Sequence, residues 1–296
     1  MMHKVLIFLL FSIIFYSNIF AQEKPKDVTA PETPKEKKLE KKLVKKLYSV
    51  PQFAHESVLF VKQPTKWKGN NWLKAGGVVA IALIVMPFDE DIVNSTQGQQ
   101  QYYYSIPVVA GRVYGEWYSI GGVFGLFGLY GIIFHDTAAK KISVELLQAG
   151  IYSELFTELL KVSIGRARPY ESLGAYTFHP FTLLDDGFNS MPSGHTTAAV
   201  ALSTVMSRHA HSTALKIIAY IPAGFTMFSR IYQDKHWLSD EVLGAAIGFF
   251  TGNWVVDLHE GKRHRINVTS IYPSTSLSVN LDWKSTKKIK QSEYFW

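Results

Sequence analysis

The sequence predicts an all-α fold, a membrane-associated bundle of about six helices followed by a small C-terminal β-hairpin. Three observations favour this fold class. The chain has 296 residues, 47% of them hydrophobic, and its mean hydropathy of +0.03 is high for a soluble enzyme and low for a chain made only of membrane spans. Apolar runs recur through its middle, and glycines punctuate several of them, which suits close contact between helices. Its last segment alternates polar and apolar residues, as a strand does.

The chain divides into four predicted segments. They are a signal peptide over 1–21, a Lys/Glu-rich linker with a short amphipathic helix over 22–60, a helical domain over 61–260, and a C-terminal hairpin and tail over 261–296. Lys4 and the apolar run Val5–Tyr16 are typical of a secretory signal, with an uncleaved membrane anchor as the alternative. Leu39, Leu43 and Leu47 recur among lysines, which predicts a helix that lies on an anionic membrane surface or docks on its own domain.

The helical domain is predicted from its apolar runs. They are Ala75–Phe88, Ile120–Phe134, Thr196–Met206, Ala214–Phe228 and Val242–Val256. Each is shorter than the ~18–20 residues that a clean membrane span needs. Ile142–Leu160 also follows a helical period, although it carries three glutamates. Together these segments predict about six core helices.

Charged loops predict which side of a membrane the domain would face. Lysine-containing loops at 136–141, 207–216 and 259–265 would share the cytoplasmic side by the positive-inside tendency. The segments 161–195 and 229–240 would then face the periplasm. If the signal is cleaved, one apolar run must fail to span, and the short run Ala75–Phe88 is the candidate.

The pattern changes after Lys262. Arg265–Ile271 and Ser276–Trp283 each alternate polar and apolar residues, and Tyr272-Pro273-Ser274-Thr275 stands between them. This arrangement predicts a β-hairpin, and residues 284–296 form a basic tail.

Composition excludes some classes of site. The chain has no cysteine, so it has neither disulfides nor thiolate metal sites. Its formal charge of +7 does not by itself imply a nucleic-acid partner, because much of the positive charge lies in the predicted linker.

Chemistry is concentrated in the stretch Ser229–Asp240. If the chain is helical from Trp237 onward, His236 and Asp240 lie on one helix face at positions i and i+4. A carboxylate there can hold one ring nitrogen of His236 as its proton donor and leave the other bare and nucleophilic. Alone this is a moderate signal, because such pairs are common on ordinary helices.

Two further stretches supply an anion site. Lys161 and Arg168 stand at the end of a predicted helix, where Pro169 biases Arg168 out of helical geometry. Ser193 and Gly194 begin another predicted helix, whose free N–H groups attract anions.

The three stretches together resemble one known family. Lys161-x6-Arg168-Pro169, then Pro192-Ser193-Gly194-His195, then Ser229-Arg230-x5-His236-x3-Asp240 is similar to the signature of the type 2 phosphatidic-acid phosphatase superfamily. That superfamily also includes bacterial class A acid phosphatases and vanadium-dependent haloperoxidases. The resemblance covers about residues 115–258, and the sequence of Ser229–Gly248 is similar to that of the membrane lipid-phosphatase branch.

The resemblance implies a role for each signature residue. His236 would attack phosphorus and form a phosphohistidine, His195 would protonate the leaving alkoxide and then activate water, and Asp240 would orient His236. The residues that would bind the substrate phosphate are Lys161, Arg168, Ser193, Gly194 and Arg230. No metal or other cofactor is implied.

The implied function is hydrolysis of a lipid phosphate or diphosphate monoester at the periplasmic face of the inner membrane. Its partners would be the lipid and the membrane, with no nucleic acid and no obligate protein partner. The alternative is a soluble or peripheral periplasmic acid phosphatase for small phosphate esters. A vanadate-using oxidative enzyme and a non-catalytic envelope protein are the remaining alternatives.

Charged residues near the signature are expected to play lesser parts. Arg166 is expected to face solvent or lipid headgroups rather than phosphate. Glu154 and Glu158 share a helical stripe with Lys161 and are expected to tether it. His209 is expected to be an exposed loop residue.

Overall fold

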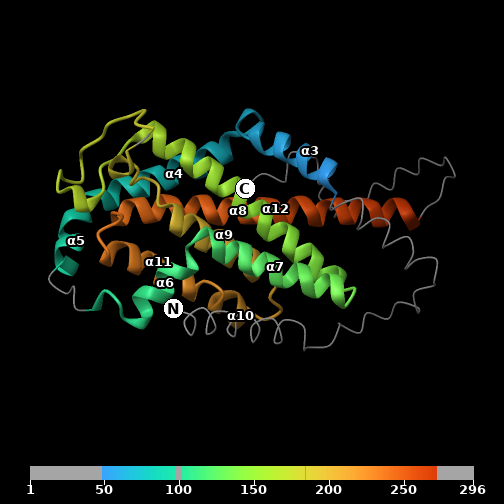
Figure 1. Cartoon of the computed structure of the whole chain (residues 1–296). Helices are drawn as coiled ribbons and strands as arrows, with labels where there is room; N and C mark the ends of the chain where they lie inside the picture. Colours follow the sequence, from blue (N-terminus) through green and yellow to red (C-terminus); the bar gives the residue numbers. More distant parts are fainter. Residues whose placement is uncertain (1–48, 98–101, 184, 272–296) are drawn as a thin grey trace.

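The computed structural model describes residues 49–97, 102–183 and 185–271. Figure 1 shows a helical molecule in which α12 runs along almost the whole length. The α-helices are α3 (Val50–Val61), α4 (Gly69–Val85), α5 (Asp89–Gln97), α6 (Ile106–Tyr114), α7 (Trp117–Ile133), α8 (Thr137–Ile164), α9 (Gly194–His209), α10 (Thr213–Ile218), α11 (Ile221–Tyr232) and α12 (Leu238–Ile271). Short 3-10 helices cover Pro64–Lys66, Met86–Phe88, Pro169–Glu171 and Asp186–Phe188.

The all-α class is confirmed for this part of the chain, because the described residues form no β-strand. All six runs predicted as core helices are helical. Their counterparts, in order, are α4, α7, α8, α9, the pair α10 and α11, and α12. Helices α3, α5 and α6 were not predicted. The predicted amphipathic helix and the signal peptide lie outside the described residues.

The predicted helix Ala214–Phe228 is two helices. Helix α10 ends at Ile218, and α11 begins at Ile221 with Pro222 in its first turn. Proline lacks an N–H donor and suits the first turn, where that donor has no partner within the helix. The break therefore follows from a single residue.

The predicted first strand of the hairpin is wrong. Helix α12 continues through Arg265–Ile271, the segment whose alternation predicts that strand. A helix that has already formed adds residues without the cost of nucleation, and no proline interrupts residues 238–271. Seven alternating residues are a weaker signal than this continuation. The predicted turn and second strand lie outside the described residues.

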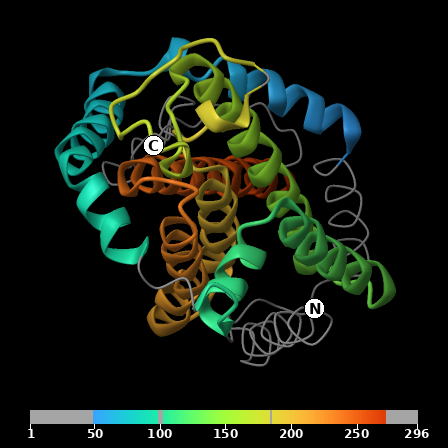
Figure 2. The ribbon, with the colours of Figure 1, turned by 60° about the vertical axis from the view of Figure 1, so that its left-hand side comes forward.

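The core is centred on α9, which packs against α8, α11 and α12. The side chains of α9 are buried from Thr196 through Ser207. A Cβ atom on Gly248 of α12 would lie 2.4 Å from the backbone oxygen of Thr197, so α9 and α12 approach as closely as only glycine permits. Figure 2 shows α12 enclosed by other helices. This packing fixes the start of α9 beside the start of α12.

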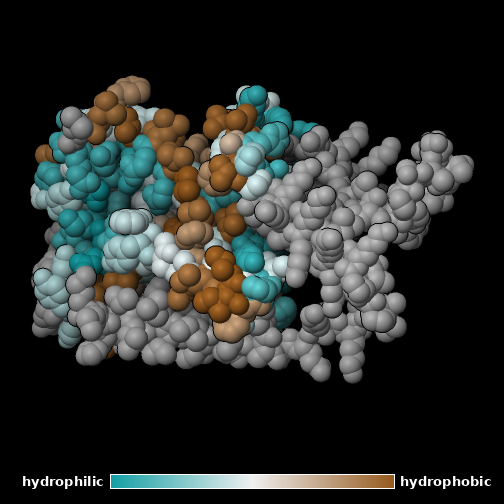
Figure 3. Space-filling model, turned by 45° about the vertical axis from the view of Figure 1, so that its right-hand side comes forward, coloured by the Kyte–Doolittle hydropathy of each residue, from teal (hydrophilic) through white to brown (hydrophobic). Residues whose placement is uncertain are grey.

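Many large apolar side chains remain on the surface. Trp72, Leu73 and Ile84 of α4 and Ile132 and Ile133 of α7 are each more than half exposed. Figure 3 shows apolar residues gathered beside a hydrophilic area on the face that it presents. Within the described ranges, none of the helices combines the length and the apolarity needed to cross a membrane.

Candidate active site

The end of α8 delivers two of the predicted cations. The helix stops at Ile164 because Gly165 takes a left-handed conformation with φ of 61°, where a Cβ atom would lie 1.8 Å from the carbonyl oxygen of His179. Lys161 in its last turn contacts Glu158 with 2.6 Å between Nζ and Oε1, which confirms this predicted tether.

Arg168 follows in the extended geometry that the proline after it predicts. Its Nη2 lies 2.6 Å from Oδ1 of Asp186, and its Nε donates to the Asp186 carbonyl oxygen at 2.8 Å. The guanidinium is thus held in place by the loop that precedes α9.

The start of α9 lies against Lys161. Ser193 is the N-cap, and its hydroxyl oxygen accepts a hydrogen bond from the Thr196 N–H. A Cβ atom on Gly194 would lie 3.0 Å from Lys161 Nζ, so glycine lets the ammonium reach the helix terminus. Positive charge from the side chain and from the helix N-terminus therefore meets at one point.

Arg230, the third predicted cation, ends α11. Its side chain is buried, and Nη1 donates to Oε1 of Gln233 at 3.0 Å. Its Nε has no hydrogen-bond partner among the described residues. A buried donor without a partner is costly, and an anion in the site would satisfy it.

His236 has one defined tautomer. Its Nδ1 lies 2.8 Å from the Ser190 carbonyl oxygen, and because a carbonyl oxygen only accepts, Nδ1 carries the proton. The other nitrogen, Nε2, is therefore bare. Burial, and after it the nearby cations Arg168 and Arg230, lower the pKa of His236 well below its usual value. A neutral imidazole with a free lone pair is the nucleophilic form.

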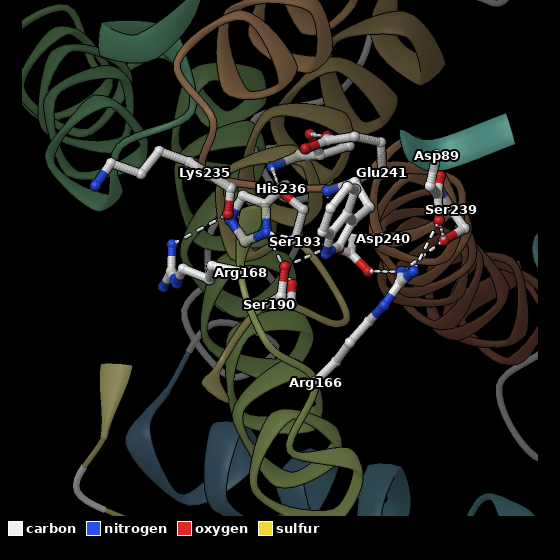
Figure 4. Close-up of polar contacts among 12 residues, drawn as sticks. Asp89, Arg166, Arg168, Ser190, Ser193, Lys235, His236, Ser239, Asp240 and Glu241 are labelled. Atoms are coloured by element: carbon white, nitrogen blue, oxygen red, sulfur yellow. Dashed lines mark hydrogen bonds and ion pairs between the residues drawn. The ribbon is translucent and has the colours of Figure 1, made fainter. Parts of the chain in front are cut away.

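Asp240 contacts His236 less directly than the helical spacing predicts. Its Oδ2 lies 3.8 Å from His236 Nδ1, whereas it accepts hydrogen bonds from Ser190 Oγ at 2.5 Å and from the Trp237 N–H at 2.9 Å. Figure 4 shows Ser190 between the two side chains. The carboxylate thus holds Ser190, and the Ser190 carbonyl oxygen holds the imidazole.

Arg166 is buried, so the prediction that it faces solvent or headgroups is wrong. Its side chain is 0% exposed and pairs with Asp240 at 2.6 Å and with Asp89 at 2.8 Å. A buried guanidinium needs such partners because its charge has left water. Figure 4 shows Arg166 reaching both carboxylates from the side opposite His236. His209 was also wrongly placed, because its ring contacts buried Glu145 at 2.5 Å.

Four further residues at the site were missed. They are Asp89, Glu116, Ser190 and Glu241. Glu241 gave the clearest sequence signal, because it stands beside Asp240 at the start of an apolar, Gly/Ala-rich segment. Burying a second carboxylate there is costly unless it has a partner. It is buried and accepts a hydrogen bond from Thr196 Oγ1. Asp89 gave none, because the acidic run Asp89-Glu90-Asp91 looks like an ordinary helix start.

The structure brings the eight predicted site residues into one region. Lys161, Arg168, Arg230 and His195 all act electrostatically on His236, and Ser193 and Gly194 adjoin Lys161 and Asp240. Such a cluster of cations, helix N–H groups and a bare imidazole can bind a phosphoryl group and attack it. In the described part of the chain, no group of three or more His, Cys, Asp or Glu side chains could hold a metal ion.

Comparisons with known proteins identify relatives for part of the chain. The lipid A 1-phosphatase of Porphyromonas gingivalis is 37% identical over 90 residues, which are 29% of this chain and 20% of the relative. That of Rhizobium etli is 31% identical over 114 residues, 36% of this chain and 46% of the relative. The chain thus spans less than half the length of these relatives.

Solved structures give weaker matches. The crystal structure of Aquifex aeolicus LpxE has a TM-score of 0.44 at 20% identity, covering 57% of this chain and 94% of that chain. The transmembrane PAP2 type phosphatidylglycerolphosphate phosphatase from Bacillus subtilis has a TM-score of 0.49 at 20% identity, covering 64% and 96%.

A family model described as the PAP2 superfamily matches residues 143–263. This segment contains all three signature stretches, helices α9 and α11, and most of α12. The matched segment and the cation-lined histidine site agree, so residues 143–263 are similar to the PAP2 superfamily, which the signature stretches also resemble.

Proposed function

We propose that the protein is a phosphatase that hydrolyses a lipid phosphate monoester through a phosphohistidine intermediate. The observation that carries this proposal is the tautomer of His236, whose Nδ1–H is fixed by the Ser190 carbonyl oxygen. The bare Nε2 stands in a neutral ring, because burial and then the nearby cations lower the pKa of His236. A nucleophile and a phosphate site therefore coincide.

The proposed reaction has two steps. In the first, His236 Nε2 attacks phosphorus, the bond from phosphorus to the ester oxygen breaks, and His195 gives a proton to the leaving alkoxide. In the second, His195 takes a proton from water, which attacks the phosphohistidine and releases inorganic phosphate. The first step thus leaves His236 phosphorylated and His195 without its proton, and the second step returns both histidines to their starting forms.

Positive side chains lower the barrier of both steps. A phosphate ester carries about −1.5 to −2 charge, and Lys161, Arg168 and Arg230 would neutralise it. The Ser193 hydroxyl and the Gly194 N–H would bind equatorial oxygens, where charge rearranges in the transition state. The unpaired Nε of Arg230 fits this role, because phosphate offers it an acceptor.

A lipid is the favoured substrate class. The sequence relatives are named lipid A 1-phosphatases, which favours a lipid A phosphate over phosphatidic acid, phosphatidylglycerol phosphate or undecaprenyl diphosphate. Exposed apolar side chains such as Leu73 and Ile132 support contact with a membrane, because large apolar surfaces seldom face water alone. We place the active site at the periplasmic face of the inner membrane, following the charge of the loops.

The test is an assay of purified protein against a panel of lipid and soluble phosphates, with His236→Ala as the control. We expect turnover of a lipid phosphate, loss of nearly all of it in His236→Ala, and an acid-labile phosphoryl group on the wild-type protein after rapid quenching. Undiminished turnover in His236→Ala would overturn the mechanism. Preference for soluble esters, with release from membranes by carbonate, would support the soluble alternative instead.

A further inference from the structure

Glu116 contacts the second histidine of the site from outside the segment that the family model matches. It is the N-cap residue of α7, yet its side chain makes no capping hydrogen bond. Instead its Oε1 lies 3.3 Å from Nε2 of His195, with both side chains about a quarter exposed. The carboxylate thus leaves the helix terminus that it could cap and lies against an imidazole.

The backbone around Glu116 is built for this approach. A Cβ atom on Gly115 would lie 2.8 Å from the backbone oxygen of His195 and 2.5 Å from Cγ2 of Thr226. Only glycine fits there without a shift of the start of α9. The turn between α6 and α7 therefore packs directly on the residue that bears the imidazole.

Helix α6, which leads into this turn, is itself anchored to α11. Thr226 Oγ1 donates to the Gly111 carbonyl oxygen at 2.7 Å, and Ser229 Oγ donates to the Val108 carbonyl oxygen at 2.7 Å. Since Arg230 follows Ser229, one rigid unit positions both Glu116 and a phosphate-site cation. The contact between Glu116 and His195 is thus part of the site's framework.

The contact also assigns the ring nitrogens of His195. A carboxylate oxygen only accepts, so Nε2 carries a proton when the two groups bond. Nδ1 makes no hydrogen bond to any other described residue and is left to exchange a proton with substrate or water. Hydrogen bonds of this kind are often long without substrate and tighten when it binds, which fits 3.3 Å.

We propose that Glu116 is a positioning residue for the general acid and base, holding His195 as the Nε2–H tautomer and supporting its charged form. The inference rests on the proposed role of His195. The site would then contain two histidines oriented by different means, His236 by a backbone carbonyl oxygen and His195 by a carboxylate. Glu116 acts through His195 and touches no reacting atom.

Charged groups on several helices affect the pKa of His195 and oppose the effect of Glu116 on it. The charged and titratable groups that face this pair are Arg112 of α6, Tyr118 of α7, Lys161 of α8, Arg230 of α11 and His236. Burial and the cations Arg230 and Lys161 lower the pKa of His195, whereas Glu116 raises it. Contact with His195 in turn lowers the pKa of Glu116, so the carboxylate is charged at neutral pH. Without Glu116, only bound substrate would favour the imidazolium.

The test compares two leaving groups in the Glu116→Gln variant. An alkyl phosphate releases an alkoxide that needs a proton, whereas p-nitrophenyl phosphate releases a phenolate that does not. General acid catalysis contributes about 10²–10⁴-fold, and partial loss of it should lower kcat/KM for the alkyl ester by about 10- to 100-fold. For the aryl ester we expect less than about a threefold loss. A merely structural role would lower both alike.

The pH profile gives a second readout. The alkaline limb of kcat/KM for the alkyl ester reports the loss of the acid's proton in the free enzyme. Because removing Glu116 lowers the pKa of His195, this limb should move to lower pH in Glu116→Gln. Glu116→Asp keeps the charge and should restore part of the shift. In a His195→Gln background, Glu116→Gln should have no further effect.

Controls separate this inference from the proposed function. Glu260→Gln also removes a half-exposed carboxylate that pairs with a cation, because Glu260 lies 2.7 Å from Arg208. It stands in the C-terminal half of α12, away from the candidate site, and its loss should leave turnover of both esters unaffected. If His236→Ala keeps wild-type turnover, the proposed function and the inference both fail. If His236→Ala is inactive but Glu116→Gln affects both esters equally, or neither, the inference alone is overturned.

Discussion

The Arg166 guanidinium donates from Nη1 to Oδ1 of Asp240 across 2.6 Å, and neither side chain is exposed to solvent. On its other side Arg166 donates to Oδ2 of Asp89 at 2.8 Å and to the Ala175 carbonyl oxygen. Burial raises the pKa of Asp240, and the positive charge of Arg166 offsets this most among its neighbours. Arg166 therefore stabilises the charged form of Asp240 at a position that water does not reach.

Removing Arg166 should destabilise the whole fold. Arg166→Met fills similar space but leaves Asp89 and Asp240 without a cation, and breaking a buried pair typically costs about 3–5 kcal/mol. We expect the free energy of unfolding to fall by this amount in urea titrations. The partly exposed Arg112→Met is the control, and it should change this free energy by less than about 1 kcal/mol. A similarly small change in Arg166→Met would contradict the role of the ion pair.

Asp89 should matter for turnover although it lies outside the matched segment. Its Oδ1 accepts a hydrogen bond from the N–H of Ser239, the residue before Asp240, at 2.9 Å. Asp89 therefore caps the start of α12. Asp89→Asn keeps one acceptor but loses the charge facing Arg166. We expect kcat to fall by about tenfold with KM nearly unchanged, because the cations proposed to bind the phosphate, Lys161, Arg168 and Arg230, stay in place. Asp91→Asn, at an exposed position on the same helix, should have no effect.

Asp240→Asn should cost less than His236→Ala. Where a carboxylate alone sets the histidine tautomer, its loss lowers kcat by about 10⁴-fold. Here a backbone carbonyl oxygen fixes Nδ1–H, and Asp240 acts only through Ser190. We therefore expect a loss of about 10- to 100-fold in kcat for Asp240→Asn, against several orders of magnitude for removal of His236, the proposed nucleophile. Equal losses would show that Asp240 contacts His236 directly during turnover.

Local patterns predicted much of this fold. Apolar runs located the six core helices, Pro169 predicted the extended Arg168, and the signature residues do meet at one site. The pattern misled where two local signals competed, as in Arg265–Ile271, where a growing helix outweighs a short alternation. Such competition is decided by the structure on either side of the segment.

Contacts between distant segments were beyond local patterns. Asp89 stands 77 residues before Arg166, and Glu116 is far from His195 in the chain. Nothing within one turn of either acid indicates its partner, because packing of α5 and of the α6–α7 turn brings them there. The same holds for Arg166, whose position between two predicted phosphate-binding residues suggested a surface side chain. Its burial depends on carboxylates from two other segments.

Glu241 should give the protein a pH-dependent stability of a defined sign. Burial raises the pKa of Glu241 from its ordinary 4.5 to about 8. The folded state therefore binds a proton that the unfolded state releases between these values, so this group makes stability fall as pH rises from about 4.5 to 8. Glu154, with a pKa raised to about 7, adds a slope of the same sign in both proteins and cancels on comparison. Glu241→Gln keeps the shape without the charge, so its melting temperature should fall less than that of the wild type between pH 5 and pH 8. Parallel melting curves at both pH values would mean that Glu241 is charged in the folded protein.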